Sequence, residues 1–193
     1  MRSPALLSPA RRYAPLAIFL HWAVAALILI GWALPHLRAV LPNDRAPIID
    51  LHRSVGITVF ALVLVRLVWR FFDPPPALPG GTTQIVRWLA HAGHAALYLL
   101  MLAVPVCGML LTWAAGRSIM VWGFFTVPTP IAPAPGLRET FEHLHGLLAN
   151  TLIWLVAFHA AGALVHHYIF KDGLLERMLP GQRRRSRSPS ALI

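Results

Sequence analysis

The sequence predicts an all-α membrane protein, a bundle of four transmembrane helices. Two observations predict this fold. First, 57% of the 193 residues are hydrophobic and only 12% are charged, a composition typical of membrane proteins. Second, the apolar residues form four long stretches, each of which exceeds the roughly 20 residues that a helix needs to cross a bilayer.

The four spans are expected over residues 15–37, 49–72, 85–112 and 141–171. The N-terminus lacks the cleavage site of a signal peptide, so the first span should remain a helix. A proline-rich connector, residues 73–81, ends the second span, and Pro105 should kink the third. The longest loop, residues 113–137, is rich in proline and aromatic residues, and we expect it to lie on the membrane surface.

The positive charges predict the orientation. Twelve Lys and Arg residues flank the ends of the spans that share a side with the termini, and five flank the opposite ends. By the positive-inside rule both termini are cytoplasmic, in a multi-pass protein of the bacterial inner membrane. We therefore expect a cytoplasmic N-terminal segment over residues 1–14, a four-helix domain over 15–172 and a basic cytoplasmic tail over 173–193. The formal charge of +10 is spread around apolar spans, which argues against nucleic-acid binding.

Histidines inside the spans are the candidate functional residues, because ionisable groups at membrane depth are costly and mark functional sites. His145 and His159 lie 14 residues apart in the last span. At about 100° and 1.5 Å per residue they share one helix face and stand roughly 21 Å apart along the axis. One metal ion cannot bind both imidazoles, so two stacked centres are expected.

The depths of two further histidines match these levels. His21, near the start of the first span, lies at the cytoplasmic level of His159, and His52 lies at the outer level of His145. Haem suits such pairs, since its iron takes two axial imidazoles and its apolar faces pack between helices. A zinc site would require several ligands at one level.

Several stretches together resemble the bacterial cytochrome b561 family, which is related to the cytochrome b subunits of nickel-iron hydrogenase and formate dehydrogenase. These are FLHWAVA, LHRSVGITVFALVLVRLVWR, LAHAGHAALYLLMLAVPVCG, HGLLAN and FHAAGALVHHYIFKDGLLERMLP, and the likeness covers about residues 11 to 180. The resemblance implies four transmembrane helices holding two haems b. It also implies one axial ligand from each of the first two helices and two from the fourth, here His21, His52, His145 and His159.

The resemblance implies electron transfer between a quinone pool, with ubiquinone as the expected partner, and a small-molecule or protein donor on the periplasmic side. Some members of the family are superoxide:ubiquinone oxidoreductases, and others are membrane anchor subunits of a periplasmic dehydrogenase or hydrogenase. A quinone site is expected at His91 and His94, with His166 and His167 at the same depth, because imidazoles can accept the protons that a quinol releases. Interfacial histidines that contact carbonyls or headgroups are the simpler interpretation.

The roles of three arginines stay open on sequence alone. Arg66 and Arg70 can pair with haem propionates or with lipid phosphates. Arg53 can draw a small anion such as superoxide to the outer centre, or can pair with a propionate.

A non-redox metal transporter is a third possible function, and the sequence disfavours it. The interiors of the spans carry no Asp or Glu to share a cation's charge. Membrane lipids are expected to surround the bundle, and a homodimer is among the open oligomeric states.

Overall fold

The computed structural model describes residues 12–40, 45–76 and 82–181, and four long helices account for most of them. These are α1 (Pro15–Val40), α2 (Arg45–Phe72), α3 (Gln84–Ala114) and α4 (Pro135–Val165). Each is long and apolar enough to cross a membrane, which confirms the predicted fold class. The expectations for residues 1–11, 77–81 and 182–193 lie outside the described residues.

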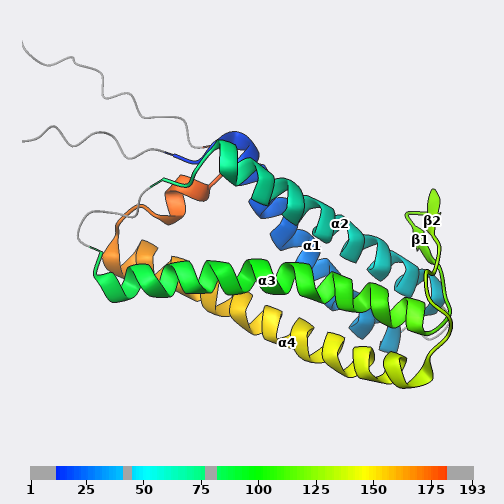
Figure 1. Ribbon diagram of the computed structural model, residues 1–193. Helices are drawn as coiled ribbons and strands as arrows, with labels where there is room; N and C mark the ends of the chain where they lie inside the picture. Colours follow the sequence, from blue (N-terminus) through cyan, green and yellow to red (C-terminus); the bar gives the residue numbers. More distant parts are fainter. Residues whose placement is uncertain (1–11, 41–44, 77–81, 182–193) are drawn as a thin grey trace, which may run out of the picture.

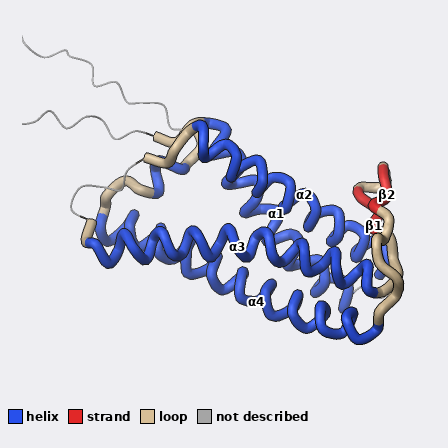
Figure 2. Tube along the Cα trace, viewed as in Figure 1, coloured by secondary structure: helices blue, strands red, loops and turns tan. Residues whose placement is uncertain are grey.

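The helices are arranged as two antiparallel pairs (Figures 1 and 2). α1 packs along α2 and α3 along α4, α2 joins the pairs through α3, and α1 and α4 make little direct contact. One end of the bundle, here called the terminal end, holds the start of α1 and the end of α4. The opposite end carries a β-hairpin and is called the hairpin end. The two pairs diverge toward the terminal end (Figure 1).

The last helix differs in its bounds from the predicted span. α4 begins at Pro135, because proline is favoured in the first turn of a helix, where its missing N–H is not needed. After Val165 the chain makes one π-helical stretch, His166–Phe170, and Lys171 ends it in a left-handed conformation. A short 3-10 helix, Leu175–Met178, follows. Residues 173–181, which we expected to begin the tail, thus continue the folded chain.

The loop between α3 and α4 contains a hairpin that the sequence pattern did not predict. β1 (Ile119–Val121) pairs antiparallel with β2 (Phe125–Val127), and Ile119 faces Val127 across the pair. Ile119 and Val121 are 1% and 2% exposed and point inward, while Met120 between them is exposed. β1 packs on α2, so alternation of side chains along a strand lets this short segment bury its apolar face.

Two side chains of α2 hold the turn of the hairpin. Trp122 has a φ of 51°, a costly conformation for a bulky residue. Its backbone N–H donates to Ser54 Oγ at 2.9 Å and its indole N–H to Thr58 Oγ1 at 3.0 Å. Ser54 is 2% exposed, so the bond to its hydroxyl forms where water cannot replace it. The two α2 hydroxyls therefore stabilise the strained turn.

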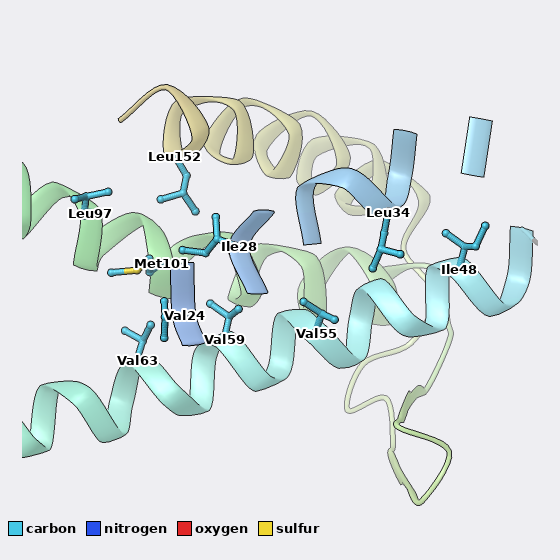
Figure 3. Close-up of a cluster of buried hydrophobic side chains, with 10 residues drawn as sticks. All are labelled: Val24, Ile28, Leu34, Ile48, Val55, Val59, Val63, Leu97, Met101 and Leu152. Carbon is cyan, nitrogen blue, oxygen red and sulfur yellow. The ribbon is translucent and has the colours of Figure 1, made fainter. Parts of the chain in front are cut away.

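The core of the bundle is an apolar cluster in its middle (Figure 3). Among its members are Val24 and Ile28 of α1, Val59 and Val63 of α2, Leu97 and Met101 of α3, and Leu152 of α4. Leu152 is the only buried residue in α4, all of which the structure describes. The core is thus built mainly by α1, α2 and α3, and most of the surface of α4 is left uncovered by other helices.

Replacing Ser54 by Ala should loosen the hairpin without unfolding the bundle. The change leaves the backbone N–H of Trp122 without its acceptor, and an unsatisfied buried donor costs about 1–3 kcal/mol. Amide hydrogen exchange at residues 119–127 should accelerate, whereas exchange in the four helices should not change. Thr140→Ala is the control, since the Thr140 hydroxyl donates within its own helix, to Gly136 O. Unchanged exchange in the hairpin would show that Ser54 does not hold it.

Candidate functional site

The structure brings the four central histidines together as two pairs, one toward each end of the bundle. The ring centroids of His21 on α1 and His159 on α4 are 6.2 Å apart. Those of His52 on α2 and His145 on α4 are 6.0 Å apart. The pairing by depth that the sequence predicts is therefore the pairing in space, and α4 contributes one imidazole to each pair.

The pair at the hairpin end is oriented by backbone carbonyls. His52 Nδ1 lies 2.9 Å from Gly31 O of α1, and His145 Nδ1 lies 3.0 Å from Val104 O of α3. A carbonyl only accepts, so each Nδ1 carries the proton and donates it. Each Nε2 is then left with its lone pair. Metal-binding histidines are commonly fixed in this way, with the second ring nitrogen bonded to a carbonyl.

The pair at the terminal end has a different neighbour. Arg66 Nη1 lies 3.0 Å from His21 Nδ1. Since a guanidinium only donates, His21 Nδ1 accepts in this contact, and the proton of a neutral ring is on Nε2. An iron at Nε2 would require that proton to move to Nδ1. Arg66 would then have to donate to another acceptor, such as a carboxylate.

Further polar groups gather at the terminal end. Arg66 and Arg70 each lie with the guanidinium carbon 5.8 Å from the centre of the Tyr98 ring. Tyr13, just before α1, is close enough for both charges to affect its pKa. Burial raises the pKa of the Tyr13 hydroxyl, and the charges of Arg70 and Arg66 oppose the rise. The hydroxyl therefore stays protonated at neutral pH and can donate a hydrogen bond.

His94 of α3 lies beside the terminal-end pair. Its ring centroid is 5.3 Å from that of His159, and its Nδ1 lies 2.6 Å from Ala90 O. A ring separation of 5.3 Å is shorter than the distance of about 6 Å between two imidazoles on opposite sides of one metal, with metal–nitrogen bonds of about 2 Å. His94 is therefore better placed as a neighbour of the pair than as a ligand. His91 is exposed, with Nδ1 2.6 Å from Arg87 O.

The two pairs fit an iron with two axial imidazoles. Their centroid separations, 6.0 and 6.2 Å, match the value of about 6 Å that such an iron requires. A Cβ atom added at Gly56, Gly146 or Gly162 would meet no atom within 4 Å. These glycines lie within four residues of a paired histidine, so the backbone beside the pairs is accessible to a flat apolar group. The uncovered surface of α4 agrees with this.

The two histidines after α4 are bound to carboxylates near the terminal end. His166 Nδ1 pairs with Asp172 Oδ2 at 2.6 Å, and His167 Nδ1 lies 3.5 Å from Glu176 Oε1. They lie at the depth that the sequence predicts, but each ring already has a partner within its own part of the chain.

Three further residues lie toward the hairpin end. His143 is exposed. Arg53 forms an ion pair with Asp50 at 2.8 Å, which offsets much of the charge expected to attract an anion. Cys107 is buried and donates its S–H toward Phe141 O.

The groups that orient the paired histidines could not be predicted from the sequence. The partners of His52 and His145 are the backbone carbonyls of Gly31 and Val104. Every residue has such a carbonyl, so the residue type does not reveal which ones accept these bonds. Tyr13 and Tyr98 belong to a residue type that is common at membrane interfaces. Their closeness to Arg66 becomes informative only once the neighbours of each helix are known.

Comparison with known proteins identifies one family. The family model for prokaryotic cytochrome b561 matches residues 12–181. A probable superoxide oxidase CybB of Yersinia pestis is 35% identical over 175 residues, covering 90% of this chain and 98% of that protein. Cytochrome b561 homolog 2 of Escherichia coli K12 is 35% identical over 173 residues (87% and 91%). Cytochrome b562 of Cereibacter sphaeroides is 34% identical over 174 residues (86% and 94%).

Fold and site together define a multi-pass helical membrane protein with imidazole pairs suited to haem. The chain belongs to the prokaryotic cytochrome b561 family. It is thus a membrane b-type cytochrome, an electron carrier, and the resemblance predicted from the sequence is confirmed. Membership of the family implies haem b binding, and the haem iron supplies one-electron chemistry when bound.

Replacing Gly108 by Val should lower the amount of haem b bound per protein. A Cβ atom at this position would lie 3.0 Å from His145 Cε1 and 3.2 Å from its Nδ1, so the larger side chain displaces the ring. Gly136→Val is the matched control, because a Cβ there meets nothing within 4 Å. Haem content is read from the absorbance of the reduced pyridine complex. Equal haem content in the two variants would show that the His145 ring does not depend on Gly108.

Proposed function

We propose that the protein holds two haems b and carries electrons across the bacterial inner membrane, between a quinone pool and a donor on the periplasmic side. His21 and His159 would bind one haem at the terminal end, and His52 and His145 the other at the hairpin end. The observation that carries this proposal is the presence of two imidazole pairs, each at the spacing for one iron, with one member of each on α4.

The depth of the two pairs supports transfer across the membrane. His145 and His159 are 14 residues apart, or roughly 21 Å along α4, in a hydrocarbon layer of about 30 Å. Each pair therefore lies toward one surface, and an electron that enters at one end leaves at the other. The excess of Lys and Arg at the terminal end supports a cytoplasmic position for that end.

Residues at the terminal end support a quinone site there. Reduction of a quinone consumes two electrons and two protons, and its carbonyl oxygens need hydrogen-bond donors. His94 touches the terminal-end pair, and His91 lies three residues before it, exposed near the start of α3. His94 Nδ1–H is already bonded to Ala90 O, so we propose that His94 donates to the quinone from Nε2 when the ring is doubly protonated, and that His91 links it to water. Arg66, once His21 Nδ1 carries a proton, is proposed to bind a haem propionate.

Superoxide is the proposed donor, by analogy with the Yersinia relative that is named a probable superoxide oxidase. An anchor subunit that takes electrons from a periplasmic dehydrogenase is the second candidate. Stopped-flow mixing of the purified protein with superoxide, and separately with quinol, tests the choice. If the protein oxidises superoxide, both superoxide and quinol should reduce the haems at catalytic rates. Reduction by quinol alone would contradict the superoxide role and favour the anchor function.

Replacing His159 by Ala should remove one haem and leave the second spectroscopically intact. The variant removes a proposed axial ligand of the terminal-end haem only, because the other histidine of α4, His145, is a proposed ligand of the hairpin-end haem. His145→Ala is the mirror-image control and should remove the haem that His159→Ala retains. Haem content and the spectra of reduced minus oxidised protein distinguish the two. Full occupancy in either variant would contradict the proposed ligands.

Replacing both His91 and His94 by Leu should slow electron exchange with quinone by about tenfold or more. This is the range expected for the loss of a proton-transfer group. Haem content should not change, since neither residue is a proposed ligand. His143→Leu, an exposed histidine at the other end, is the control and should have normal kinetics. Unaltered quinone kinetics in a double variant with full haem content would show that the quinone site lies elsewhere.

A further inference from the structure

The terminal end of the bundle poses a mechanical problem for the histidine pair that it holds. His21 is on α1 and His159 on α4, yet these helices make little direct contact. The helix pairs to which they belong diverge toward this end (Figure 1). Two ligands of one iron must keep a fixed separation, so some other part of the chain has to set the distance between α1 and α4.

The segment after α4 spans this divergence. It leaves the end of the π-helical stretch and runs to the start of α1, in orange in Figure 1. Lys171 and Gly173 turn the chain back with φ angles of 50° and 71°. We call residues 172–179 the strap. The short 3-10 helix Leu175–Met178 forms its middle part.

Two histidines attach the strap to the end of α4. His166 Nδ1 bonds to Asp172 Oδ2 at 2.6 Å, and both side chains are mostly buried, at 23% and 17% exposed. The other oxygen of Asp172 accepts from the backbone N–H of Leu174 at 3.1 Å. His167 Nδ1 lies 3.5 Å from Glu176 Oε1. The carboxylates of the strap thus fix it to the helix that carries His159.

Two side chains of the N-terminal part attach the strap to α1. Arg12 donates to Glu176 O at 3.1 Å and to Leu179 O at 3.2 Å. The indole N–H of Trp22 donates to Met178 O at 2.8 Å. Trp22 directly follows His21, and the centroids of the two rings are 5.4 Å apart. The strap is therefore bonded through Met178 to the residue next to His21.

We infer that the strap sets the distance between α1 and α4 and so aligns His21 with His159. Asp172 and Trp22 are its positioning residues, one at each attachment, and neither is a proposed ligand of the iron. The hairpin-end pair has no need of the strap, because backbone carbonyls orient its rings. This inference rests on the proposed binding of two haems. It predicts that damage to the strap affects one haem and spares the other.

The test uses the full-length, haem-loaded protein and two single variants. Trp22→Phe keeps an aromatic ring and loses the donor to Met178 O. Asp172→Ala loses the bonds to His166 and to the Leu174 N–H. Trp154→Phe is the matched control, since Trp154 is 67% exposed on α4, far from the strap in sequence. Haem loss to an excess of a haem-free acceptor protein is followed for each haem by its absorbance, and the ferric haems are examined by EPR.

Trp22→Phe should release the terminal-end haem about fivefold faster, the effect expected for one lost hydrogen bond, and Asp172→Ala, which loses two bonds, at least as fast. That haem is identified as the one missing in His159→Ala, and its EPR g values should shift as the rings change orientation. The hairpin-end haem should keep its release rate and its g values. Equal acceleration for both haems, or none for either, would contradict the strap. A wild-type protein with a single haem would instead contradict the proposed function, and haem content shows this before any variant is made.

Discussion

The fixed rise of one helix is the constraint on which the rest of the structure depends. α4 carries a histidine of each pair, so the backbone geometry of a single element sets the separation of the two levels. Two other helices then have to present one imidazole each at the right depth. α1 and α2 both do so near their starts, and because these helices are antiparallel the two histidines fall at opposite ends of the bundle.

Between the two levels the buried core of the bundle is apolar. Leu152, the one buried residue of α4, lies seven residues from each paired histidine of that helix and enters the same cluster as Val24, Val59 and Met101 (Figure 3). Such a core offers no hydrogen-bonded path for protons. Protonation chemistry is therefore confined to the two ends, and the abundance of polar groups at the terminal end, among them His94, explains why proton-coupled chemistry is proposed there.

Residue type and spacing were enough to predict the four spans, the pairing of His21 with His159 and of His52 with His145, and the family. The spans and the pairs follow from hydropathy and from the helical repeat, which are local properties of the chain, and the family follows from the resemblance of whole sequence segments. The hairpin was missed, because its turn depends on contact with Ser54 and Thr58 of a distant helix. The strap was missed for the same reason, since its bonds to Arg12 and Trp22 use backbone carbonyls.

The central claim is that two haems lie at separate depths along α4, and the distance between their irons tests it most directly. Pulsed EPR measures the dipolar coupling between two low-spin ferric haems in the purified protein. The proposed ligands predict a single iron–iron distance of about 20 Å, set by the 14 residues between His145 and His159. No dipolar modulation in protein with full haem content, or a distance below about 15 Å, would contradict the two-level arrangement.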